Sequence, residues 1–95
     1  MAVKINIRRR VPKGKEAQLL PLLLMLRSKA LNQPGYISGE TLRNVNEAED
    51  YVTISTWKSV DDWKACEIGR ERWEIQAKID DLLEEKTAYG IYFYG

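Results

Sequence analysis

The sequence contains no histidine and only one cysteine. Without histidine, the chain cannot use Ser-His-Asp or Cys-His catalysis, bind a metal through imidazole, or hold a haem by a proximal histidine. Any acid–base chemistry must therefore come from Asp, Glu, Lys, Tyr or Cys side chains. The single cysteine, Cys66, has no partner for an internal disulfide, which is typical of a reducing compartment, so we expect a cytoplasmic protein.

The chain also lacks an excess of charge and a long apolar segment. Fifteen Lys and Arg residues against fourteen Asp and Glu residues leave a net charge of +1, which argues against nucleic acid or a membrane surface as a partner. The longest apolar stretch, Leu19–Leu26, contains Pro21 and is far shorter than the roughly 18 residues of a membrane-spanning helix. No signal-peptide apolar region follows the N-terminus. We expect a single domain over residues 1–95.

Hydrophobic periodicity predicts strands and helices in the order β-α-β-β-α-β. Residues Val3–Arg8 alternate apolar and polar, so Val3, Ile5 and Ile7 are expected to face the core. Five further elements follow: a helix from about Lys13 or Lys15 to Leu31, strands over Tyr36–Arg43 and Tyr51–Lys58, a helix from Ser59, and a strand over Thr87–Tyr94. This order is the split βαβ pattern.

The two strands that follow the first helix carry unusual features. Gly39 lies inside the first of them, where a glycine marks a bulge, a bend or the close approach of another backbone. In the second, one face consists of Tyr51, Thr53, Ser55 and Trp57, and is polar with large ends. Such a face suits a wet interior or a subunit contact.

The second helix and the end of the first strand are rich in charge. Ser59 is a suitable N-cap and Gly69 is expected to interrupt the helix. We interpret most of the charged residues of this helix as a solvated face, and not as a catalytic carboxylate pair. These residues are Glu71, Arg72, Glu74, Lys78, Asp80, Asp81, Glu84 and Glu85, opposite an apolar stripe of Ile68, Ile75, Ile79 and Leu82. Likewise, we interpret Arg8-Arg9-Arg10 as a solvated strand end in preference to a phosphate-binding cluster.

Two features indicate more apolar surface than one subunit can cover. The helix that ends at Leu31 is apolar almost all round, so either it is unusually buried or part of it meets another chain. The last strand carries Tyr89 and Phe93 on one face and Tyr92 and Tyr94 on the other. Because two helices cover only one face of a sheet, a second subunit is the simplest cover for the other.

Several segments together resemble the antibiotic biosynthesis monooxygenase-like family. They are PGYISGETLRN, YVTISTWKSVDDW, RERWEIQAKID and the Tyr-rich last strand, so the resemblance covers nearly the whole chain. It implies a ferredoxin-like α+β domain with a four-stranded antiparallel sheet, two copies of which pair into a dimeric α+β barrel. It also implies a pocket between the sheet and the helices of each subunit.

The resemblance implies two kinds of activity. Some members of the family are cofactor-free oxygenases that turn polyketide phenols into quinones, and others degrade haem. In the haem-degrading pattern, a pocket asparagine, a pocket tryptophan and the iron-binding histidine fall on Ile7, Cys66 and Gln76 of this chain. All three residues differ, and Gln76 is a poor replacement for an axial imidazole. We therefore expect neither haem degradation nor any cofactor.

The function expected from this resemblance is a cofactor-free monooxygenase acting on a small aromatic compound. The alternative is a non-catalytic homodimeric binding protein for a small hydrophobic ligand. RNA binding through the same element order is excluded, because the strand YVTISTWK lacks the glycines and leading basic residue of that motif. The sequence identifies no catalytic residue and no metal ligand. The candidate substrate-binding residues are Ile7, Trp57, Trp63, Cys66, Trp73 and Gln76.

Overall fold

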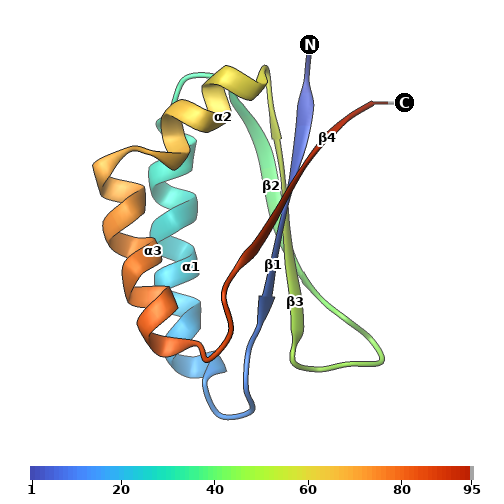
Figure 1. The fold of residues 1–95 in the computed structure, drawn as a ribbon, viewed down its shortest axis with the longest axis vertical. Coiled ribbons are helices and arrows are strands. Elements are labelled where there is room, and N and C mark those ends of the chain that lie inside the picture. Colours follow the sequence, from blue (N-terminus) through green and yellow to red (C-terminus); the bar gives the residue numbers. More distant parts are fainter. Residues whose placement is uncertain (95) are drawn as a thin grey trace.

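The computed structural model describes residues 1–94 as one sheet with helices on one side of it (Figure 1). Along the chain the elements are β1 (Val3–Arg10), α1 (Glu16–Leu31), β2 (Tyr36–Arg43), β3 (Asp50–Trp57), α2 (Val60–Glu67), α3 (Arg70–Leu82) and β4 (Ala88–Phe93). The predicted ferredoxin-like fold is confirmed, with the second helix divided into α2 and α3.

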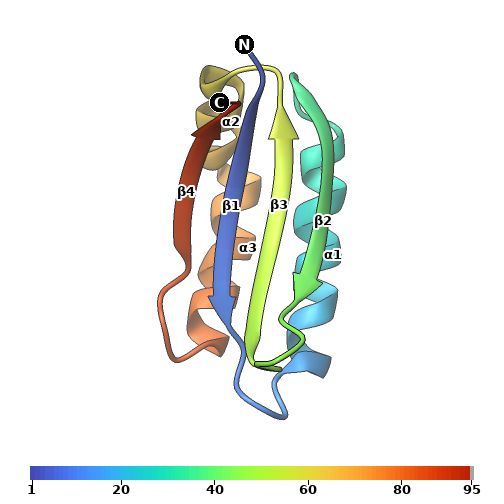
Figure 2. The same cartoon turned by 90° about the vertical axis from the view of Figure 1, so that its right-hand side faces the viewer.

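The four strands form an antiparallel sheet in the order β2-β3-β1-β4. Helices α1 and α3 lie side by side behind the sheet, and none of the described elements covers its other face (Figure 2). Val3, Ile5 and Ile7 are buried on the helix side, as the alternation predicts. In β3, the polar face with Thr53 and Ser55 also turns toward the helices, since these residues lie opposite Ile7 and Ile5.

Two local signals explain where the second helical segment starts and divides. The Ser59 hydroxyl accepts a hydrogen bond from the Asp62 backbone N–H at 3.1 Å, which confirms the predicted N-cap. Gly69 separates α2 from α3, as expected, and becomes the N-cap of α3. The placement of Ile68 in the apolar stripe is wrong, because Ile68 ends α2 at this break and is 79% exposed.

The three arginines at the end of β1 do not share one environment. The strand continues to Arg10, two residues beyond the predicted end, so alternation turns Arg9 inward, where it is 3% exposed. Arg8 and Arg10 point outward and form ion pairs, with Asp50 at 2.8 Å and Glu49 at 3.1 Å respectively. The interpretation of a solvated strand end is therefore wrong for Arg9.

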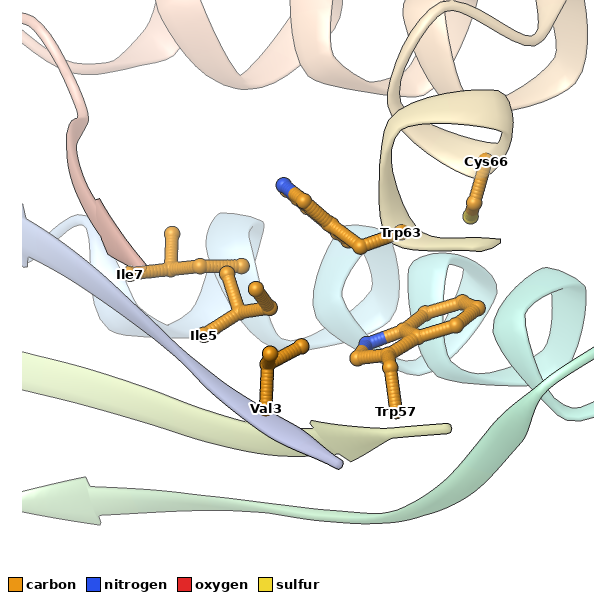
Figure 3. Packing of buried hydrophobic residues seen from close by; sticks show 6 residues of the cluster. All are labelled: Val3, Ile5, Ile7, Trp57, Trp63 and Cys66. Carbon is orange, nitrogen blue, oxygen red and sulfur yellow. The ribbon is translucent and has the colours of Figure 1, made fainter. Parts of the chain in front are cut away.

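The buried side chains form two clusters between the sheet and the helices. One contains Val3, Ile5, Ile7, Trp57, Trp63 and Cys66 (Figure 3). The other contains Val11, Leu19, Tyr51, Ile75, Ile79 and Leu83. Helix α1 contributes only Leu19 as a fully buried residue, whereas Leu20, Leu24 and Leu31 are exposed. Of the two alternatives for this helix, unusual burial is therefore excluded, and the leucine-rich surface of α1 stays open in this chain.

Gly35 holds the turn between α1 and β2 in a conformation that disfavours other residues. Its φ is +84°, and a β-carbon there would collide with the side chain of Asp62. We expect Gly35→Ala to lower the free energy of unfolding by about 3 kcal/mol, combining the left-handed strain with overpacking. Gly14 has φ +92° but nothing within 4 Å of such a β-carbon, so Gly14→Ala should cost only ~1 kcal/mol. Urea unfolding of both variants tests the difference, and equal losses would contradict it.

Candidate functional site

A cavity of about 440 Å³ lies between α1 and the helix-facing side of the sheet. This volume is in the range of ligand sites, roughly 300–1,000 Å³. Leu20, Leu23, Leu24 and Leu26 of α1 form an apolar wall, and α2 adds Trp63. The exposed leucines of α1 therefore border an internal space as well as the surface.

The sheet side of the cavity is formed by the polar face of β3 and the adjoining part of β2. Thr53 and Ser55 line it together with Gly39, which lies opposite Ser55 in β2. A β-carbon on Gly39 would come within 2.7 Å of the Tyr36 hydroxyl. Gly39 thus leaves room for the Tyr36 side chain, a role that differs from the bulge, bend or backbone approach predicted for it.

Aromatic side chains form a connected row along one end of the cavity. The ring centroids of Tyr36 and Trp57 are 5.3 Å apart, those of Trp57 and Trp63 are 5.7 Å apart, and both pairs meet edge to face. Trp63 continues to Tyr89 at 6.2 Å. The Trp57 indole N–H donates to the Ser55 hydroxyl at 3.0 Å. These contacts fix the orientation of the rings, so flat surfaces of defined direction bound the cavity.

Two buried arginines add positive charge to this largely apolar lining. Arg9 donates to the Gln76 side-chain oxygen at 3.1 Å and to the Thr53 hydroxyl at 3.4 Å. Arg72 is 8% exposed and donates to the Tyr89 hydroxyl at 3.1 Å. Burial is the main cause that lowers the pKa of Arg9 to about 10, so its guanidinium remains charged at neutral pH.

The structure brings four of the six sequence-predicted site residues together in the cavity lining. These are Ile7, Trp57, Trp63 and Cys66. Trp73 lies outside the lining and is 65% exposed. Gln76 is also outside the lining, and its amide N–H groups donate to Asp80 at 2.9 Å and to Thr87 at 3.0 Å. The side-chain oxygen of Gln76 accepts from Arg9, so Gln76 positions the Arg9 side chain. The polar side-chain atoms of Gln76 are thus all hydrogen-bonded within the chain.

Arg9 and Arg72 are the buried charged residues of the lining that the sequence interpretation missed. Assigning Arg72 to the solvated face of the helix was wrong, since it is buried. The signal was present in both cases. Arg9 continues the alternation of Val3, Ile5 and Ile7, and Arg72 lies three residues before Ile75, on the apolar side of α3. Both arginines were assigned to the solvent because they are charged, although their positions in the periodic pattern indicated burial.

The lining offers an ordinary buried thiol and no metal site. Burial raises the pKa of the Cys66 thiol, so the nucleophilic thiolate is disfavoured at neutral pH. Among residues 1–94, no group of three or more Cys, Asp or Glu side chains is placed to hold a metal ion. Within the same residues, no helix has the length and apolar character to cross a membrane.

Comparisons with known proteins agree with this architecture. A conserved protein from Methanosarcina mazei Go1 has a TM-score of 0.92 at 18% identity, with 100% of this chain and 94% of that chain covered. SnoaB, a cofactor-independent oxygenase from Streptomyces nogalater studied as a mutant, has a TM-score of 0.87 at 17% identity, with 98% and 92% covered. At these identities the likeness shows the fold.

Sequence comparison gives a family assignment. No curated protein matches the chain significantly. The family model described as antibiotic biosynthesis monooxygenase matches residues 2–67, well over half of the sequence. The chain therefore belongs to the antibiotic biosynthesis monooxygenase family.

Proposed function

We propose that this protein is a cofactor-independent monooxygenase that acts on a small aromatic compound held in the cavity. The observation that carries the proposal is the cavity itself, about 440 Å³ in volume and bounded by Tyr36, Trp57 and Trp63. Family membership supports it, as does the likeness to SnoaB, which is a cofactor-independent oxygenase. Aromatic rings of fixed direction favour a flat substrate, and the leucines of α1 offer it an apolar wall.

The proposed reaction needs no reductant other than the substrate. A phenol loses its proton and passes electrons to O₂ while a ring carbon forms a bond to oxygen. The O–O bond then breaks, one oxygen atom leaves as water, and the other remains as the second carbonyl oxygen of a quinone. For phenol itself the balance is C₆H₆O + O₂ → C₆H₄O₂ + H₂O. The cavity contributes by holding the phenol in a dry position where O₂ can reach the ring.

Oxygen uptake with a panel of hydroxynaphthalenes and anthrones tests this proposal. We expect uptake of one O₂ per substrate consumed, together with the absorbance of a quinone. Trp63→Phe should lower kcat/KM by about tenfold or more, because it removes part of the surface that orients the substrate. Trp73→Phe is the matched control, since Trp73 lies outside the lining. No uptake above autoxidation across the panel would contradict the proposal.

A non-catalytic binding role is the second candidate. It is favoured by Ile7 and Cys66, which line the cavity without an ionised group for acid–base chemistry. Tight binding of a small hydrophobic aromatic ligand, with no consumption of O₂ over the same panel, would support this role against the oxygenase.

We also propose that the open face of the sheet pairs with a second copy of the chain. Register places Leu42, Val52 and Ile54 on this face, and Tyr92 lies there opposite Lys4. Leu42 and Tyr92 are exposed, while Val52 and Ile54 are half-buried. Charged residues, among them Lys4, Arg8 and Glu40, share this face with the apolar ones. Apolar side chains on a sheet face without a cover are typical of an interaction surface. The dimeric barrel implied by the family resemblance would cover it.

A further inference from the structure

We infer that the cavity recognises an anionic oxygen group on its aromatic ligand, a carboxylate or a phenolate, through Arg9 and Arg72. This inference rests on the proposed function for the location of the ligand, and it adds the charge that the ligand must carry. The two arginines belong to different elements, β1 and α3, and both line the same cavity.

Arg9 is a buried charge without a counter-charge in contact. It forms no ion pair with a carboxylate of residues 1–94, although Arg8 and Arg10 on either side of it both do. Its Nε is buried and has no hydrogen-bond partner within those residues. A fully buried charge is normally paired, because an unpaired one costs several kcal/mol. An anion in the cavity would supply the missing partner.

Asp80 is joined to Arg9 by hydrogen bonds only through a neutral group, although its charge also acts on Arg9 and raises its pKa. Gln76 accepts from Arg9 and donates to Asp80, so the amide stands between the guanidinium and the carboxylate. Among the causes that lower the pKa of Arg9, burial is the largest, and the charge of Arg72 adds to it. The two cations therefore destabilise each other. An anion bound between them would reduce both the cost of burying the charge of Arg9 and the repulsion between the two arginines.

Arg72 extends the same cationic region toward the aromatic row. Its guanidinium carbon lies 5.0 Å from the centroid of the Trp63 ring and 5.4 Å from that of Tyr89. Like Arg9, it has no carboxylate ion pair within the described residues. The stacking holds the cation beside the rings that would bind an aromatic body. Positive charge next to a flat apolar surface suits an aromatic anion.

Trp63 provides a second unused donor in this region. Its indole Nε1 is buried and has no acceptor among residues 1–94. Figure 3 shows this nitrogen on the side of the indole that faces Ile7, away from Cys66. Buried polar atoms are nearly always hydrogen-bonded, either to the protein or to ordered water. The unpaired N–H groups of Trp63 and Arg9 are accounted for together if an oxygen acceptor occupies the cavity.

Titration calorimetry with matched probes tests the inference. The first pair is 2-naphthoate and 2-naphthamide, which share one shape and differ in charge. We expect the carboxylate to bind at least about tenfold more tightly than the amide. Arg9→Gln and Arg72→Gln should each weaken naphthoate binding by at least about tenfold and change naphthamide binding by less than about threefold. Arg10→Gln is the matched control, since Arg10 faces outward, and it should leave both affinities unchanged.

A second probe separates the two sources of negative charge. The ionisation of 4-nitrophenol is followed by its absorbance, and a phenolate site should lower its pKa on binding. If the protein prefers naphthoate to naphthamide but does not change the pKa of nitrophenol, the ligand group is a carboxylate. If it lowers the pKa of nitrophenol but does not prefer naphthoate, the ligand group is a phenolate. Circular dichroism confirms the fold of each variant, and Arg72→Gln serves if Arg9→Gln does not fold.

The inference is overturned if neither anionic probe binds more tightly than its neutral form, including the case in which none binds. It is also overturned if the arginine variants keep the anion preference. Failure of the proposed function is distinct. A protein that prefers naphthoate but consumes no O₂ with any phenol contradicts only the oxygenase, and one that oxidises phenols without an anion preference contradicts only this inference.

Discussion

Replacing Trp57 with alanine is expected to lower the free energy of unfolding by about 4 kcal/mol, a large part of the stability of so small a domain. Trp57 is 1% exposed and belongs to the cluster that joins β1, β3 and α2. Its removal would take away the edge contacts with Tyr36 and Trp63 and leave the Ser55 hydroxyl without the indole donor. The existing cavity adjoins this position, so the new space would merge with it.

Trp73→Ala is the control for this prediction because it deletes the same side chain at a site that is 65% exposed. We expect its effect to stay within about 0.5 kcal/mol. Guanidinium unfolding followed by far-ultraviolet circular dichroism measures both values. Similar losses in the two variants would mean that Trp57 does not support the core. Trp57→Phe should fall between the wild type and the alanine variant, since it keeps one ring.

Ile54→Lys should turn the proposed dimer into a monomer. Ile54 lies on the open face of β3, opposite Asn6 of the central strand β1. A lysine there would be solvated in the separate subunit but buried in the dimer, with only Glu40 of the neighbouring strand opposite it as a counter-charge. If this costs about 3 kcal/mol, the dissociation constant rises by roughly a hundredfold. Sedimentation equilibrium over a range of protein concentrations measures the change.

Ile68→Lys is the control for the dimer, because Ile68 is an exposed apolar residue at the end of α2, away from the sheet. We expect this variant to keep the association state of the wild type. A wild-type protein that sediments as a monomer at tens of micromolar would disprove pairing through the open face. So would an Ile54→Lys variant whose mass stays dimeric.

Periodicity could predict the fold because local and global preferences agree along most of the chain. The alternation at Val3, Ile5 and Ile7 specifies the buried face of β1, and Ser59 specifies the start of α2. The errors lie at the ends and breaks of elements. Stopping the first strand at Arg8 hid Arg9, and continuing one apolar stripe across the interruption expected at Gly69 gave Ile68 a place in that stripe.

The candidate site could be predicted only in part, for a different physical reason. Trp57 and Trp63 could be found because large aromatic residues near a strand–helix junction are expected to be buried there. The resemblance implied the place of the cavity between the sheet and the helices, but its volume could not be predicted, since the volume depends on how closely α1 approaches the sheet after all side chains are packed. The role of Gln76 depends on a hydrogen bond to Arg9 across 67 positions of the chain. No periodicity contains that information.

The unequal positions of the three tryptophans give the protein a built-in optical reporter. Trp57 and Trp63 border the cavity, whereas Trp73 is largely in contact with solvent. After Trp73→Phe, all tryptophan emission would come from the cavity, so quenching by acrylamide would report its accessibility and a shift of the emission maximum would report its filling. A ligand search could then proceed by fluorescence, without any labelled compound or knowledge of the reaction.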